Sequence, residues 1–244
     1  MRKVVLLQSP SKLADVVPIF YAESKKKGLF DHYYVITDYT GPLPEEDDFT
    51  VVRQPKDEQF ATNMLKLMES VPEDVFYFCC EDYIVDPEVD VSKVHDAFDF
   101  ACETDNLGFL RLSHHKKVKL AHKDGPYAPM NPGYQYYISL QPSIWRKEYF
   151  KHCLKPGEDA WITEINGSKR ARGHSSLISY GCTSPVFWYE NFYKSGQYMR
   201  NSYAKYVKEH EVDMDASRKV YVVDENGNKK FVKLRKWKNK RGNK

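Results

Sequence analysis

The feature of this chain that most constrains its fold is a short apolar run that stops at two adjacent acids. The run, Val75–Cys80, is rich in aromatic residues, follows Pro72, and leads directly into Glu81 and Asp82. Short apolar runs of this kind are typical of strands buried on both faces inside an α/β sheet. Open α/β sheets bind their ligands at the carboxyl ends of such strands. Glu81 and Asp82 are therefore candidate ligand-binding residues, with the start of a solvated loop as the alternative.

Segments with strand and helix character alternate along most of the chain, which predicts an α/β fold with a mostly parallel central sheet flanked by helices. Strands are expected at residues 3–8, 32–37, 50–53, 75–80, 107–112 and 136–140. Helices are expected from about Ser11 to Gly28 and at residues 57–71, 91–104, 143–154 and 161–169. Later, residues 220–223 and 231–234 flank Asn226-Gly227, a pattern that predicts a small C-terminal β-hairpin.

The length and composition indicate one large globular domain without a transmembrane helix. The 244 residues contain no run of about 18 apolar residues, so we expect no transmembrane helix, and the N-terminal apolar stretch is too short for a signal peptide. The five cysteines lack metal-site spacing and are expected to be reduced thiols of a cytoplasmic protein. We expect residues 1–235 to form a single domain, followed by a basic tail at 236–244.

The net charge of +3 is unevenly distributed. Residues 229–244 hold nine Lys or Arg and no acid, so the remaining 28 basic and 34 acidic residues give the rest of the chain a charge of −6. A basic end on an acidic body is typical of proteins that meet an anionic surface, such as a membrane or a polyanion. We therefore expect a cytoplasmic protein that is peripheral to a membrane, with a merely solubilising end as the alternative.

A second acidic cluster lies far along the chain, beside a distinctive pattern. Residues 137–145 read YISLQPSIW, residues 156–161 read PGEDAW, and Glu164 follows. Together with the strand–helix–strand order and the acid-ended strand, this pattern resembles the GT-A glycosyltransferases, in particular a family of bacterial and viral sugar transferases. The resemblance covers roughly residues 3–190 and implies a Rossmann-like domain that binds a nucleotide-diphosphate sugar.

The resemblance also implies a metal site. The family's Asp-x-Asp motif reads Cys80-Glu81-Asp82 here, so the last acid is retained and the first is missing. Asp82, with Glu81 as the residue that would replace the missing acid, is expected to hold Mn²⁺ or Mg²⁺ against the diphosphate through oxygen ligands.

A catalytic base is the second requirement of sugar transfer, because the attacking hydroxyl is a poor nucleophile. The resemblance implies that Asp159 takes the proton, with Glu158 and Glu164 as rivals, and that a single displacement inverts the anomeric carbon. From the residues alone, the favoured interpretation of Glu158 and Asp159 is the acidic start of a helix, and the resemblance favours the catalytic role instead. Trp145 and Trp161 are expected in the core, with the wall of an acceptor site as the alternative.

Nucleotide contacts are expected from the ends of the first three strands. Gln8 and Ser9 end the first strand, Asp38 ends the second and Arg53 the third. Glu81 joins them as a candidate nucleotide-sugar contact, because strand ends are where bases and ribose hydroxyls bind in open sheets. No dinucleotide-binding or P-loop glycine pattern is present, which argues against those two classes.

These observations predict a glycosyltransferase that moves a sugar from a nucleotide-diphosphate donor to a hydroxyl of a glycan or lipopolysaccharide-type acceptor. A nucleotidyltransferase typically shows a glycine-rich, basic first loop, which this chain lacks. The alternative from another class is a non-catalytic module that binds nucleic acid or glycan through the basic end and a surface rich in the chain's 18 tyrosines. We expect no obligatory nucleic-acid partner, since the body is acidic.

Overall fold

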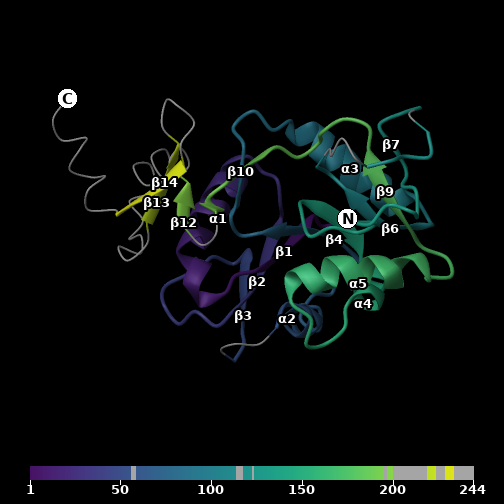
Figure 1. The fold of residues 1–244 in the computed structure, drawn as a ribbon. Coiled ribbons are helices and arrows are strands. Elements are labelled where there is room, and N and C mark those ends of the chain that lie inside the picture. The colour runs from purple at the N-terminus through teal and green to yellow at the C-terminus, as the bar shows by residue number, and fades with distance from the viewer. Residues whose placement is uncertain are drawn as a thin grey trace.

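The protein is built on an eight-stranded sheet with helices on both faces (Figure 1). The structure, a computed structural model, describes residues 1–55, 59–113, 118–122, 124–194, 197–199, 219–223 and 229–233. In spatial order the strands are β3 (Phe49–Arg53), β2 (His32–Thr37), β1 (Val4–Gln8), β4 (Val75–Cys80), β8 (Ser143–Arg146), β6 (Leu107–Arg111), β9 (Ile178–Cys182) and β7 (Tyr127–Pro129).

The sheet is mainly parallel, as the alternating pattern predicts. Strands β3, β2, β1 and β4 are parallel neighbours, and β6 pairs in parallel with β9. Strand β8 runs antiparallel between β4 and β6, and β7 runs antiparallel to β9. The carboxyl ends of β1, β2 and β4 therefore meet at one edge, where an open sheet places its ligands.

Two separate apolar clusters hold the helices against the sheet. One face packs on the 3₁₀ turn η1 (Ser11–Val16), α1 (Val17–Lys26) and α3 (Val91–Glu103). The other face packs on α2 (Phe60–Leu67), α4 (Lys147–Cys153) and α5 (Ala160–Arg172). Strand β1 is apolar because both of its faces are buried. Val5 and Leu7 lie in the first cluster, whereas Val4 and Leu6 lie in the second, since successive side chains of a strand point to opposite faces.

The expected helix at residues 143–154 is only partly right. Its first four residues form β8, and the helix α4 begins at Lys147. Ile144 lies in one apolar cluster and Trp145 in the other, so the two side chains fill opposite faces of the sheet. A strand that passes directly into a helix hides this period-two alternation inside a longer apolar segment.

The expected strand at residues 136–140 is wrong. This segment consists of turns, and the amides of Ile138 and Leu140 donate to the side chains of Ser168 and Glu164 instead of to a neighbouring strand. Tyr137 and Ile138 are nevertheless buried against the second cluster, which is why the sequence has the apolar character of a strand.

Two smaller sheets complete the fold. Strand β5 (Tyr83–Val85) pairs with β10 (Tyr189–Asn191), and a four-stranded sheet contains β11 (Tyr193–Lys194), β12 (Gln197–Met199), β13 (Lys219–Val223) and β14 (Lys229–Lys233). Antiparallel pairing of β13 with β14 confirms the predicted hairpin, whereas its turn and the basic tail lie outside the described residues. Within the described part of the chain, no helix is both long and apolar enough to cross a membrane.

Candidate functional site

The end of β1 carries two buried polar atoms that the protein leaves unsatisfied. Gln8 Oε1 and Ser9 Oγ have no hydrogen-bond partner among the described residues, and Ser9 is fully buried. The Ser9 amide donates to the Ile36 carbonyl, which fixes the backbone between β1 and β2. Because buried polar atoms in native proteins almost always have partners, these two are candidates for binding a ligand at this edge.

Asp38 and Arg53 lie at the same edge of the sheet, but their side chains already have partners. Asp38 accepts hydrogen bonds from the Ser11 amide, at 2.6 Å, and the Ser11 hydroxyl, at 3.0 Å. Arg53 is exposed and donates to the Tyr39 carbonyl. Asp38 thus fixes the start of η1, and Arg53 holds the loop that follows β2.

The acidic pair Glu81 and Asp82 follows β4 directly, and Glu81 is buried whereas Asp82 is half-buried. Burial, followed by the neighbouring Asp82 charge, raises the pKa of Glu81 well above its ordinary value. Burial raises the pKa of Asp82 to about 6. Neither carboxylate forms an ion pair with any described Lys, Arg or His. Ionisation of both carboxyl groups would concentrate negative charge here, and a bound cation would relieve that repulsion.

The acidic pair fits a divalent cation that is shared with a substrate. The described residues contain no group of three or more His, Cys, Asp or Glu that could hold a metal by itself. Mg²⁺ is commonly held by one or two carboxylates, with substrate phosphates and water completing its shell. Asp82 and Glu81 are the residues that would supply those carboxylates here.

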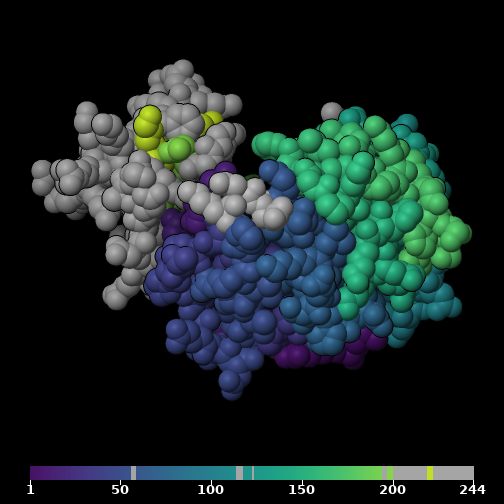
Figure 2. Space-filling model, turned by 90° about the horizontal axis from the view of Figure 1, so that it is seen from below, coloured from purple at the N-terminus to yellow at the C-terminus, as the bar shows by residue number. Residues whose placement is uncertain are grey.

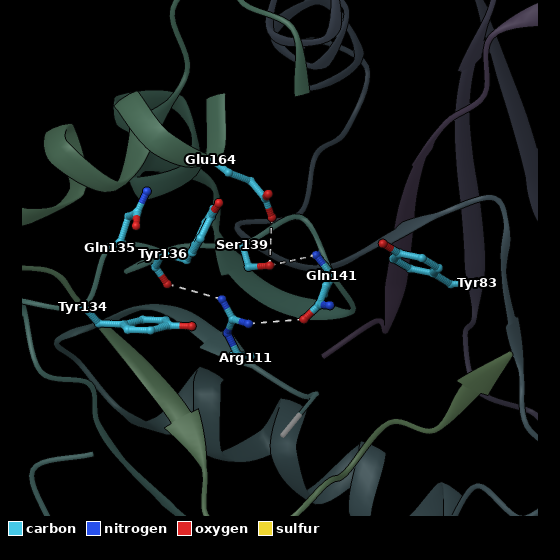
Figure 3. Close-up of a pocket in the computed structure, with 8 residues that line it drawn as sticks. All are labelled: Tyr83, Arg111, Tyr134, Gln135, Tyr136, Ser139, Gln141 and Glu164. Atoms are coloured by element: carbon cyan, nitrogen blue, oxygen red, sulfur yellow. Dashed lines mark hydrogen bonds between the residues drawn. The ribbon is translucent and has the colours of Figure 1, made fainter. Parts of the chain in front are cut away.

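A cavity of about 420 Å³ opens on the carboxyl side of β4 and β6 (Figure 3). Its walls come from the residue after the acidic pair, the end of β6, the turn segment before β8, and α5. The lining residues are Tyr83, Arg111, Tyr134, Gln135, Tyr136, Ser139, Gln141 and Glu164. Seen from the side of α2, α4 and α5, the purple-to-blue first half of the chain and its green second half lie against each other (Figure 2).

Of the three candidate bases, Glu164 is the one that lines this cavity. Its Oε1 accepts hydrogen bonds from the Ser139 hydroxyl, at 2.9 Å, and from the Leu140 amide, at 2.8 Å. The two donors come from the turn segment before β8 and hold the carboxylate in one orientation. Figure 3 shows the bond from Ser139. Glu164 therefore presents a positioned carboxylate to the cavity.

Glu158 and Asp159 have structural partners at the start of α5. Asp159 is the N-cap of α5, and its carboxylate accepts from the Ile162 amide at 2.7 Å. Glu158 pairs with Arg170, with Oε1 and Nη1 3.0 Å apart, and accepts from Asn166. Burial acts to raise the pKa of Glu158, but the hydrogen bonds from Arg170 and Asn166 outweigh it and the pKa is lowered.

The acidic pair is connected to the Glu164 cavity through its chain neighbour Tyr83. Tyr83, the residue after Asp82, lines the cavity that Glu164 lines. Burial is the main cause of the raised pKa of Tyr83, and the charges of Asp82 and Glu164 both add to it. The Cys80 thiol donates to the Leu140 carbonyl at 3.5 Å, while the Leu140 amide donates to Glu164. Two hydrogen bonds thus connect the end of β4 to the second acidic position.

Arg111 is a cavity residue that the sequence analysis missed. It ends the strand β6 and is 4% exposed. The sequence predictions considered polar residues that follow a strand, whereas Arg111 lies within the expected strand at residues 107–112. A single charged residue in an otherwise apolar strand is a usable signal, because Arg is rarely buried without a partner.

The two tryptophans have opposite environments. Trp145 is fully buried, as expected for a core residue, and donates to the Ser143 hydroxyl. Trp161 is 79% exposed on α5, so its expected place in the core is wrong. It precedes Glu164 by three residues and therefore lies on the same side of the helix as the cavity-lining carboxylate.

Comparison with solved structures places the fold among GT-A-like and nucleotidyltransferase-like proteins. Residues 1–349 of S. aureus TarS match with a TM-score of 0.55 at 11% identity, over 77% of this chain and 59% of that one. A UDP-glucose pyrophosphorylase complexed with UDP-glucose matches with a TM-score of 0.54 at 13% identity, over 86% and 99% of the two chains. The mannosyltransferase PcManGT from Pyrobaculum calidifontis, in complex with GDP-Man and Mn²⁺, matches with a TM-score of 0.54 at 12% identity, over 80% and 58%.

These likenesses show the fold alone. This chain spans less than two thirds of the length of the TarS and PcManGT chains. No family model and no curated protein matches the sequence. The expected fold class, a Rossmann-like sheet of the GT-A kind, is confirmed.

Proposed function

We propose that the protein is a glycosyltransferase that moves a sugar from a nucleotide-diphosphate donor to a hydroxyl acceptor. The observation that carries the proposal is a cavity lined by the positioned carboxylate of Glu164 and by Tyr83, the residue that directly follows the acidic pair Glu81 and Asp82. Sugar transfer needs carboxylates at two places that one substrate can span. One set holds a cation at the diphosphate, and another carboxylate takes the proton of the acceptor hydroxyl.

The donor nucleotide is assigned to the edge formed by β1, β2 and β4. The unsatisfied atoms of Gln8 and Ser9 offer one acceptor and one hydroxyl there, and Asp38 and Arg53 shape the neighbouring loops. Nucleotide-sugar complexes of two structures with this fold, one with UDP-glucose and one with GDP-Man and Mn²⁺, support this assignment.

Asp82 and Glu81 are assigned to a divalent cation, Mn²⁺ or Mg²⁺, at the diphosphate. When bound, such a cation stabilises the negative charge that develops on the leaving diphosphate. The two carboxylates bind in their ionised form, so the raised pKa values set a lower pH limit for this role.

Glu164 is assigned as the general base that takes the proton of the attacking hydroxyl. The Ser139 and Leu140 donors orient it, and it faces the cavity, whereas Glu158 and Asp159 are engaged at the start of α5. One carboxylate that assists one direct displacement inverts the anomeric centre. The cavity then receives the transferred sugar and the acceptor hydroxyl.

The acceptor is assigned to the glycan or lipopolysaccharide class. The basic residues of segment 229–244 would bring the enzyme to an anionic membrane or polyanion on which such acceptors are carried.

Thermal-shift measurements with nucleoside diphosphates and nucleotide sugars, with Mn²⁺ or with a chelator, test the proposal directly. We expect one nucleotide series to raise the melting temperature, and more so with Mn²⁺, because a ligand that binds only the folded state stabilises it. Asp82→Asn should remove the Mn²⁺-dependent part, while Asp159→Asn serves as the matched acidic control.

Incubation of the stabilising donor with a panel of glycosides then separates the enzyme classes. Release of nucleoside diphosphate with a new glycosidic bond supports the proposal. Formation of a nucleotide sugar from a sugar phosphate and a nucleoside triphosphate would instead identify a nucleotidyltransferase. Glycan binding without turnover of any donor would identify a non-catalytic module.

A further inference from the structure

Arg111 places a positive charge inside the protein at the wall of the cavity. Its backbone pairs with Ser143 of β8 and Gly181 of β9, so the residue sits in an interior strand, and it is 4% exposed. Burial lowers the pKa of Arg111, but a guanidinium stays protonated in proteins. A buried charge is costly unless an opposite charge compensates it.

The hydrogen-bond partners of Arg111 are all neutral. Nη1 donates to Gln141 Oε1 at 3.2 Å, and Nη2 donates to the Tyr136 carbonyl at 3.3 Å (Figure 3). Nε is buried and has no partner among the described residues, and Arg111 forms no ion pair with any described carboxylate. The guanidinium, which has five N–H donors, therefore keeps unused donors beside the cavity and has no ion-pair partner among the described carboxylates.

Glu164 lines the same cavity, and its negative charge partly offsets the effect of burial on the pKa of Arg111. Its Oε1 is held by the Ser139 hydroxyl and the Leu140 amide, and no ion pair joins it to Arg111 among the described residues. The cavity thus has a fixed positive group on one wall and a fixed negative group on another.

We infer that the cavity binds a sugar that carries a negatively charged substituent, a carboxylate or a phosphate, with Arg111 as its counter-ion. This inference rests on the proposed function and specifies its substrate class. Guanidinium groups bind carboxylates and phosphates in a bidentate manner, and such charge-assisted bonds are the strong ones. The volume of about 420 Å³ is at the lower end of the range of ligand pockets, about 300–1,000 Å³, which suits a monosaccharide unit.

Two fixed charges orient such a sugar. The anionic substituent binds Arg111, and a hydroxyl on another part of the ligand reaches Glu164 as a hydrogen-bond donor. A neutral sugar makes the second contact alone and leaves Arg111 without an anionic ion-pair partner. A ligand that lacks the group recognised by a buried polar side chain leaves that side chain unpaired, so the binding site discriminates strongly against such a ligand.

The first experiment uses the unaltered protein at constant ionic strength. Thermal shifts are compared for glucuronate, glucose 6-phosphate and methyl glucoside at equal concentrations. We expect either or both of the anionic sugars to stabilise the protein and the neutral glucoside to have no effect at that concentration. Equal stabilisation by all three sugars, or by none, would overturn the inference.

A second comparison finds which substrate carries the charge. UDP-glucuronic acid is compared with UDP-glucose as donor, and a uronic-acid glycoside is compared with its neutral counterpart as acceptor. A preference for the acidic member in the donor pair assigns Arg111 to the transferred sugar, and one in the acceptor pair assigns it to the acceptor. No preference in either pair, with transfer still measurable, counts against the inference but leaves the proposed function intact.

Substitutions at Gln141 test the counter-ion role without removing the buried arginine. Gln141→Glu places a carboxylate beside Nη1 of Arg111 and should weaken binding of the anionic sugar by about tenfold or more, equivalent to about 1.4 kcal/mol. Gln141→Met, of similar size and uncharged, is the matched control. If both variants bind the anionic sugar equally, Arg111 is not its counter-ion. Nucleotide-induced thermal shifts, measured in parallel, report on the proposed function separately.

Discussion

At the scale of single residues, the orientation of Glu164 decides its assignment as the base. Its carboxylate is held by two donors, the Ser139 hydroxyl and the Leu140 amide, before any substrate binds. Glu164→Gln keeps the size of the side chain but cannot accept the proton, so we expect turnover to fall about 10²–10⁴-fold. Thermal shifts with the donor should remain close to those of the unaltered protein.

The control for this prediction is Asp159→Asn. Asn is as good an N-cap as Asp, so stability should be little changed, and turnover should stay within a few-fold. A reversal of the two results, with Asp159→Asn inactive and Glu164→Gln active, would move the base to Asp159.

The raised pKa of Asp82 should set a lower pH limit for metal-dependent binding of the donor. Burial raises its pKa to about 6, so the carboxylate is protonated below that pH and cannot hold a cation well. The Mn²⁺-dependent part of the donor thermal shift should therefore be full above pH 7 and lost as the pH falls through about 6. Binding that is unchanged at pH 5 would contradict the assignment of Asp82.

The metal-free protein should respond in the opposite direction. A carboxyl whose pKa is raised by folding contributes stability below its unfolded value, and this contribution is lost as the pH rises through about 6. Asp82→Asn should remove the Mn²⁺ response and the part of the acid stabilisation that comes from Asp82, while Glu81, whose pKa burial also raises, keeps its own contribution. Melting curves of the two proteins from pH 4 to 8, with and without Mn²⁺, separate metal binding from simple acid stabilisation.

At the scale of elements, Glu158 and Asp159, two of the three candidate bases, hold the start of α5. Glu158 pairs with Arg170, and the pair has side chains 11% and 26% exposed. Glu158→Gln should lower the free energy of unfolding by about 1–3 kcal/mol near neutral pH, because it weakens charged hydrogen bonds that are partly buried.

The pH dependence of this loss follows from the lowered pKa of Glu158. A carboxyl with a depressed pKa contributes stability above its ordinary value of 4.5, and this contribution is lost as the pH falls through the lower, folded value. Denaturant unfolding at pH 7 and at pH 3 should therefore show a smaller difference between the variant and the unaltered protein at the lower pH. Turnover at pH 7 should remain, which distinguishes a structural role from a catalytic one.

Trp161 gives a second prediction for α5. Its indole is 79% exposed, so Trp161→Ala should change the free energy of unfolding by less than about 0.5 kcal/mol. If the indole stacks on an acceptor sugar near Glu164, KM for the acceptor should rise while KM for the donor is unchanged. Trp161→Phe should recover part of the acceptor affinity, because it restores an aromatic face.

The elements also show why sequence patterns reached only part of the site. The strand β4 and its acidic pair could be predicted because their pattern is local. The cavity depends on residues 136–141, whose buried side chains resemble a strand while their amides bind Ser168 and Glu164 on α5. Such partners, 24 or more residues away, follow from tertiary packing and have no local pattern.

At the scale of the whole molecule, the C-terminal sheet is joined to the edge where the nucleotide is proposed to bind. The hydroxyls of Tyr193 and Tyr198 both donate to Asp15 of η1, in the latter case at 2.6 Å. The charge of Asp15 is also among the causes of the raised pKa of Glu81, so this contact lies close to the acidic pair. The Asn226-Gly227 signal could predict the hairpin but not its docking, because the docking depends on η1, some 180 residues earlier in the chain.

The charge distribution gives the last prediction. The body of the chain carries −6 and residues 229–244 carry nine positive charges, so attraction to an anionic surface should depend on that segment. Removal of residues 236–244, which hold five of the nine, should greatly weaken co-sedimentation with vesicles rich in anionic lipid, since each basic residue near such a surface contributes about 1 kcal/mol. Binding of the full chain should fall as salt rises from about 0.05 to 0.5 M, because the Debye length shortens.

Transfer to a small dissolved acceptor should be the same for both proteins, because the cavity residues are untouched. Equal co-sedimentation of the two proteins, or equal binding to neutral vesicles, would show that this segment does not direct the protein to an anionic membrane.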